Sequence, residues 1–155
     1  MRRRSMLLTT LLIAAGCGPS AEEQAAEAEA ARQQAIADTL AMAEATYEPA
    51  AFDSIQWVEQ SEAIARGQVV FSYSCAKCHG RAGDGTGGFV QQGDTLRPPS
   101  FLIEDWRFRD DHEGLRRQIF VGTANGMPHW GLEGLTPRDM DAVGYFIRFS
   151  LRDGG

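Results

Sequence analysis

Several features that mark common protein classes are scarce in this sequence. Its longest apolar run, residues 6–15, is shorter than the roughly 20 apolar residues that a membrane-spanning helix needs. No stretch of useful length alternates apolar and polar residues as a half-buried strand does, which argues against a β protein. Lys77 is the only lysine, so a lysine-ringed docking surface is excluded. Charged contacts with partners must therefore rely on arginine.

Cysteine is also scarce, with Cys17, Cys75 and Cys78 as the only three. A structural zinc site usually has four Cys or His ligands, and no second Cys/His pair accompanies Cys75 and Cys78. A thioredoxin-like pair follows a strand in a βαβ unit, whereas residues 64–74 have helical periodicity. Neither alternative fits this pair of cysteines.

The segment Cys75-Ala76-Lys77-Cys78-His79 has the C-x-x-C-H spacing by which c-type haem is attached. Residues three apart lie on one face of a helical turn, so both sulfurs can reach the two vinyl groups of one porphyrin. The adjacent His79 is then the proximal iron ligand. The motif predicts one covalently attached haem c.

The N-terminus has the pattern of a secretory signal peptide, residues 1–16, with arginines at positions 2–4 before the apolar run. Residues 14–17 resemble the lipobox of bacterial lipoproteins, although Ala14 stands where leucine is commonest. We expect lipidation of Cys17, because haem uses the other two cysteines and several acyl chains give stable anchoring. Gly18 carries no acidic retention signal, so the outer membrane is favoured in a two-membrane cell. The alternative is a soluble secreted form that is cut nearby.

Charge separates two parts of the mature chain. Residues 21–62 hold ten acidic residues and one basic residue, whereas residues 63–155 hold eleven of each. The acidic part is rich in alanine, glutamate and glutamine, which favour helix. Its apolar stripe is too short for a coiled-coil seam and consists of Ile36, Leu40, Ala43 and Tyr47. The sequence predicts an acidic helical tether over residues 17–52, with a partner-docking or coiled-coil helix as the alternative.

The remaining residues, 53–155, suffice for one small all-α domain, whose core is marginal unless the haem contributes to it. Three helices are expected. The first, over residues 64–74, has Gly67, Phe71 and Cys75 on one face. The second covers residues 113–121 after Asp110-Asp111. The third runs from Met140 to Leu151 after Thr136, which can cap it, and Pro137 at its first position.

These residues resemble class I cytochromes c from Ile64 to Leu151. Residues 65–80 resemble the family's N-terminal helix with its haem motif, and residues 135–147 resemble its C-terminal helix. The resemblance implies a cytochrome c fold in which these helices cross nearly perpendicularly. It also implies that Gly67 allows the close approach and that Phe146 packs at the crossing.

Met127 is the predicted distal iron ligand. Pro128 keeps the preceding residue out of helical geometry, so this Gly-Met-Pro loop can lay a thioether across the haem, and the family places its axial methionine in a similar setting. His129 is the rival ligand. Met140 is expected in the core as a gap-filling side chain, and His112 on the surface.

The surroundings of the haem are less determined by sequence. Pro98 or Pro99 is expected to offer the carbonyl that accepts the other ring N–H of His79. The propionates are expected to contact either tryptophan or arginine side chains, the candidates being Trp106, Arg107, Arg109 and Trp130. The glycine-rich residues 83–88 follow no strand, so they indicate a turn rather than a nucleotide site.

Iron that is bound by both His79 and Met127 has no open position, which predicts a one-electron carrier rather than an enzyme. We expect a membrane-tethered periplasmic cytochrome between a respiratory donor and a terminal acceptor, with redox proteins as partners and no nucleic acid or nucleotide. One alternative is a dedicated subunit of one oxidoreductase complex. The other is a catalytic or gas-binding haem, if Met127 is not a ligand.

Overall fold

The computed structural model describes residues 18–91 and 93–152. The described chain divides into two compact units, with the boundary between residues 34 and 35. The predicted signal peptide and Cys17 lie outside the described residues. Within the described ranges, no helix combines the length and the apolar character that crossing a membrane requires.

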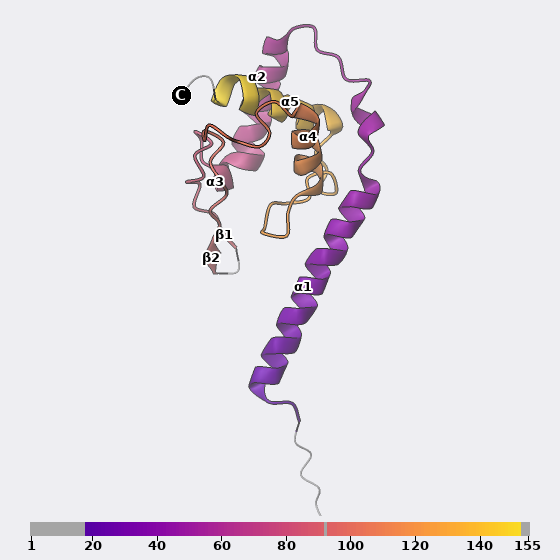
Figure 1. The fold of residues 1–155 in the computed structure, drawn as a ribbon, viewed down its shortest axis with the longest axis vertical. Coiled ribbons are helices and arrows are strands. Elements are labelled where there is room, and N and C mark those ends of the chain that lie inside the picture. The colour runs from indigo at the N-terminus through magenta and orange to yellow at the C-terminus, as the bar shows by residue number, and fades with distance from the viewer. Residues whose placement is uncertain (1–17, 92, 153–155) are drawn as a thin grey trace, which may run out of the picture. The chain divides into compact units, whose positions relative to one another are not determined.

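Helix α1 (Ala21–Thr46) confirms that the acidic segment is helical (Figure 1). Its start is a capping box, which the sequence analysis did not identify. The Ser20 hydroxyl accepts from the Glu23 N–H at 3.2 Å, and the Glu23 carboxylate accepts from the Ser20 N–H at 2.6 Å. This reciprocal pair satisfies two backbone donors that the helix itself leaves free.

The second unit includes the end of α1 and the short helix η1 (Pro49–Phe52). Ala43 has no exposed surface, and Phe52 belongs to the hydrophobic core. Packing therefore begins upstream of residue 53, inside the segment that the sequence assigned to a tether. The division into a tether over residues 17–52 and a cytochrome domain over residues 53–155 stays a prediction.

Helices α2 (Gln60–Val70) and α5 (Pro137–Phe146) make the main helix contact of the second unit (Figure 1). At Gly67 a side chain would overlap the Ala142 carbonyl group and lie 2.7 Å from Phe146 Cβ. The rings of Phe71 and Phe146 lie 5.3 Å apart beside this point. The predicted close approach at Gly67 is confirmed.

Short elements extend these two helices and lie between them along the chain. Helix α2 continues into the π-helical turn η2 (Phe71–Cys75) and α3 (Ala76–His79), and α5 continues into the π-helical turn η3 (Ile147–Leu151). A short antiparallel hairpin pairs two strands of two residues each, β1 (Val90–Gln91) and β2 (Asp94–Thr95). Strands this short leave no alternation to detect in the sequence.

Two predicted helix starts are confirmed, whereas α2 begins at Gln60, four residues before the predicted start at residue 64. Helix α4 (His112–Val121) begins where Asp111 accepts from the Gly114 N–H at 2.7 Å. Helix α5 begins where Thr136 accepts from the Asp139 N–H at 3.1 Å, with Pro137 in its first turn. Such caps satisfy N–H groups that lack partners within the helix.

A buried carboxylate ties three segments together, and the sequence analysis did not identify it. Asp141 on α5 is 4% exposed. It accepts hydrogen bonds from Trp57 at 2.7 Å, His112 at 2.9 Å and Arg116 at 3.2 Å. The expectation of a solvated His112 was wrong, because this ring packs on Tyr145 and bonds Asp141. The network joins α4 and α5 to the segment before α2.

Substituting Gly67 by alanine should weaken the domain. The new Cβ overlaps backbone of α5, so the two helices must move apart, and overpacking of this kind costs about 1–3 kcal/mol. Urea unfolding followed by circular dichroism should show a lower midpoint for Gly67→Ala. Val69→Ala, on an exposed side chain of the same helix, is the control. Equal stability of the two variants would contradict the close crossing.

Asp141→Asn should lower stability in a pH-dependent way. Burial alone raises the pKa of Asp141, but hydrogen bonds from His112 and Trp57 and the charge of Arg116 bring that pKa below its ordinary value. Stability from a lowered carboxyl pKa is present at neutral pH and is lost as the pH falls through the folded-state value. The variant should be less stable by about 1–3 kcal/mol at pH 7.

The difference in unfolding free energy between wild type and Asp141→Asn should become smaller below the unfolded-state pKa of aspartate, about 4. Denaturant titrations from pH 7 downward measure it. Asp53→Asn, at an exposed position, should behave as wild type throughout. A gap that stays constant down to acid pH would mean that the charge of Asp141 contributes nothing.

Candidate haem-binding site

The C-x-x-C-H motif lies on continuous helical backbone, as predicted. Cys75 ends η2, whereas Cys78 and His79 belong to α3. Gly80 then ends the helix with a φ of 77°, and its N–H donates to the Ala76 carbonyl at 2.9 Å. Both thiols are free. One helical turn thus presents two sulfurs and an imidazole in succession.

The two thiols lack the electrostatics of a redox-active pair. Burial raises the pKa of the Cys75 thiol to about 12, and the neighbouring Cys78 adds to this. Burial also raises the pKa of Cys78. Reactive C-x-x-C pairs lower the pKa of a cysteine instead, because the thiolate is the nucleophile. The thioredoxin-like alternative is therefore disfavoured on electrostatic as well as structural grounds.

His79 has the protonation state that an iron ligand needs. Burial lowers its pKa to about 4, so the imidazole is neutral at pH 7 and offers a lone pair. The ring stacks on Phe101 with centroids 4.5 Å apart and an interplanar angle of 21°. Its Nδ1 is buried and has no hydrogen-bond partner among the described residues. A half-buried imidazole whose inner nitrogen has no partner fits a residue that binds a further group.

The expected hydrogen bond from His79 to a proline carbonyl is absent in the described chain, so that expectation was wrong for this structure. The Pro98 carbonyl instead lies against Gly85, where it leaves no room for a side chain. The proline-bearing loop contributes packing near the motif rather than a second partner for His79.

Met127 lies in the loop of residues 122–131, the Met127 loop. Hydrogen bonds between Thr123 and Met127 close its first half into a turn. The Thr123 N–H donates to the Met127 carbonyl at 3.1 Å, and the Met127 N–H donates to the Thr123 hydroxyl at 3.2 Å. Gly122 has a φ of 74°, which favours glycine at the start of this turn. The Met127 side chain is half-buried and packs against the core, which Cys75 also borders.

His129, the rival ligand, has a structural contact. Its Nδ1 donates to the Val121 carbonyl at 2.5 Å. That carbonyl is among the last four of α4, which have no partner within the helix, so the imidazole caps the helix end. The choice between Met127 and His129 as the distal ligand stays a prediction.

The prediction that Met140 lies in the core is confirmed. Met140 has no exposed surface and lies in the core. Among the described methionines, Met42 is exposed on α1, which leaves Met127 as the one that reaches the core from a loop.

The candidate propionate residues divide between core and surface. Trp106 is buried in the core and contacts the Phe101 ring edge-on, and Trp130 is half-buried against the core. Arg107 lies over the Phe108 ring, and Arg109 donates to the Glu104 carbonyl. None of these contacts distinguishes a propionate partner.

Two residues near the site escaped the sequence analysis. Phe101 stacks on His79 from a loop, where no periodicity marks a buried aromatic residue. Thr123 closes the Met127 loop, and its only signal is a polar residue four positions before the methionine.

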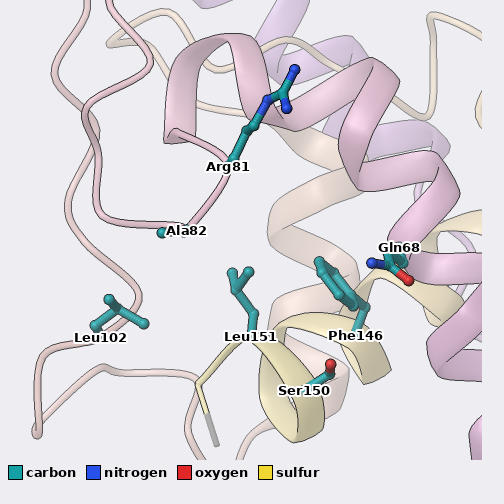
Figure 2. A pocket seen from close by; sticks show the side chains of 7 residues that line it. All are labelled: Gln68, Arg81, Ala82, Leu102, Phe146, Ser150 and Leu151. Atoms are coloured by element: carbon teal, nitrogen blue, oxygen red, sulfur yellow. The ribbon is translucent and has the colours of Figure 1, made fainter. Parts of the chain in front are cut away.

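A hollow of about 320 Å³ lies beside the motif, between α2, the end of α5 with η3, and the loop after His79. Figure 2 shows Leu151 between Phe146 on one side of this hollow and Ala82 on the other. A second hollow of about 310 Å³ shares Gln68, Arg81 and Phe146 and reaches Ala76. Neither is lined by the four predicted haem residues, so both belong to the surface next to the motif.

Comparison with known proteins identifies one family. The family described as "Cytochrome C oxidase, cbb3-type, subunit III" matches residues 62–147, a range that includes the motif and the Met127 loop. The Cbb3-type cytochrome c oxidase subunit CcoP of Rubrivivax gelatinosus is 28% identical over 86 residues, which are 56% of this chain and 25% of that protein. The chain thus matches about a quarter of that relative's length. No solved structure matches.

Proposed function

The chain belongs to the family of cbb3-type cytochrome c oxidase subunit III, and on this premise we propose that it is a monohaem electron carrier tethered in the bacterial periplasm. Membership makes it a class I cytochrome c with covalently bound haem c and a part in electron transfer. The proposal adds which residues bind the haem, where the protein acts and what it contacts.

Four residues are assigned to the haem. Cys75 and Cys78 would hold the haem through two thioether bonds, and His79 and Met127 would be the ligands of its iron. The observation that carries this assignment is the neutral, half-buried His79 ring, whose buried Nδ1 has no partner among the described residues, one residue after a free thiol. When bound, the haem supplies a one-electron couple between Fe(II) and Fe(III).

Residues of the chain would set the reduction potential of this haem couple. Burial keeps His79 unprotonated at neutral pH, so no proton competes for its lone pair. Apolar side chains exclude water from the surroundings of the motif, and they include Phe71, Phe101 and Trp106. A methionine opposite a histidine raises the reduction potential, as does an apolar surrounding. Both effects suit transfer toward a terminal acceptor.

If His79 and Met127 both bound the iron, no position would remain for a substrate, which would suit a carrier rather than an enzyme. Lipidation of Cys17 would keep the carrier near membrane partners, where the tether raises its effective concentration. Contacts with redox partners of this kind are small and transient.

A second function has one specific observation in its favour. The relative in Rubrivivax gelatinosus is named as a subunit of a cbb3-type oxidase. This chain would then be a fixed subunit of one oxidoreductase complex rather than a mobile carrier. Purification from membranes at native expression separates the two, because a fixed subunit is recovered with a stoichiometric partner.

Met127→Ala should remove the weak near-infrared band that a sulfur–Fe(III) bond gives to the oxidised wild type. It should also open the distal side to azide or CO. The reduction potential should fall by on the order of 0.1 V, since axial ligands set haem potentials across about 0.8 V. Visible and near-infrared spectra with redox titration measure these changes.

Two further variants control this experiment. Met127→His should remain low-spin with a lowered potential, and His129→Ala should keep the band because its ring caps α4. Loss of low-spin coordination in His129→Ala, together with an intact spectrum in Met127→Ala, would reverse the assignment. If neither change matters, the distal site is open and a catalytic or gas-binding haem becomes the better proposal.

Cys17→Ser should release the protein from membranes or halt its processing, while the haem spectrum stays unchanged. The basis is the sequence junction Gly16-Cys17. Fractionation followed by intact mass of the membrane-bound form tests it. A wild type that is wholly in the soluble fraction and carries no lipid mass would refute the anchor, without affecting the haem assignment.

A further inference from the structure

The last turns of α1 are docked on α4, although the sequence assigned them to a spacer. Both carboxylate oxygens of Glu44 accept from Arg117, at 2.6 and 2.5 Å. Ala43, on the same helix, has no exposed surface. The ion pair is exposed and contributes little by itself, so burial of the apolar side chains carries most of this contact.

Tyr47 is the aromatic side chain of this contact. Its ring meets Phe120 edge-on with centroids 5.3 Å apart, and it lies 6.0 Å from the ring of Phe52. Its hydroxyl is buried without a hydrogen-bond partner among the described residues. A tyrosine whose hydroxyl bonds nothing contributes through its ring alone.

Phe120 connects this contact to the Met127 loop. Its carbonyl accepts from the Gly131 N–H at 3.1 Å. Its ring fills the place where a side chain on residue 131 would lie. The next residue, Val121, binds His129. The end of α4 therefore supports the second half of the Met127 loop through two adjacent carbonyls and one ring.

We propose that Tyr47 is a positioning residue for Met127. The Tyr47 ring packs on one side of the Phe120 ring and keeps it against Gly131. This contact holds the second half of the Met127 loop next to the core. The residue that directly follows α1 would then help to position the Met127 loop, in a segment that the sequence assigned to a spacer. The inference rests on the proposed role of Met127 as distal ligand.

The test compares Tyr47→Ala with Tyr47→Phe in the full-length, haem-loaded protein. Tyr47→Phe keeps the ring and removes only the unpartnered hydroxyl, so it should match the wild type. In Tyr47→Ala the amides of Thr123, Met127 and Gly131 should exchange with solvent faster, whereas the amides of α2 and α5 should not change. The ferric protein should also bind azide more tightly, by roughly three- to tenfold, as loss of one aromatic pair permits.

Two variants guard against a general loss of stability. Tyr47→Leu keeps apolar bulk and should fold, with an intermediate increase in exchange at the loop. Ile55→Ala, which also packs against the core, should lower stability without a selective effect on the loop. Phe120→Ala should reproduce Tyr47→Ala, and the double variant should add little, because both act through one contact.

The outcomes separate the inference from the assignment of the ligand. Faster exchange of the loop amides in Tyr47→Ala, relative to α2 and α5, supports the positioning role. Uniformly faster exchange, or none, overturns it even if the wild type has the sulfur–iron band. A wild type that lacks the near-infrared sulfur–iron band would refute Met127 as the ligand, and it would refute this inference as well. The exchange data would then describe only the packing of the loop.

Discussion

At Gly67 the backbone of α2 lies against Ala142 of α5, with no room for a side chain between them. Other parts of the structure depend on this contact. Helix α2 leads directly into the turn that carries Cys75, Cys78 and His79. Helix α5 supplies Met140 and Phe146 to the core and Asp141 to the network with His112. A side chain at position 67 would displace the motif relative to the core that surrounds it.

Burial sets the chemical properties of the motif. The same apolar surroundings keep His79 neutral and both thiols protonated, because burial disfavours the charged form of each group. A small core gains stability when it encloses a large apolar group, so covalent attachment of haem serves folding and function together. The Met127 loop has a different origin, since its shape comes from hydrogen bonds at the end of α4 and from Thr123.

The sequence predicted the helices of this fold and where two of them begin. It predicted few of the contacts between residues that are far apart in the chain. Thr136 and Asp111 follow capping rules, so neighbouring residues were enough to predict these helix starts. The close approach at Gly67 was implied by the resemblance to class I cytochromes c. Trp57 and Asp141 are 84 residues apart, and no periodicity links them. His112 resembles a surface residue in sequence, and only its contacts with Asp141 and Tyr145 on α5 show why it is half-buried. The docking of Tyr47 on Phe120 was missed for the same reason.

The central claim is that Cys75 and Cys78 bind one haem covalently, and intact mass spectrometry of the exported protein tests it most directly. The account predicts a mass above that of the processed polypeptide by one haem, apart from any lipid, with colour that acidic acetone does not extract. Replacing both cysteines by alanine should give a colourless and poorly folded chain. A wild type without the added mass, or a double variant that folds normally without haem, would contradict the account.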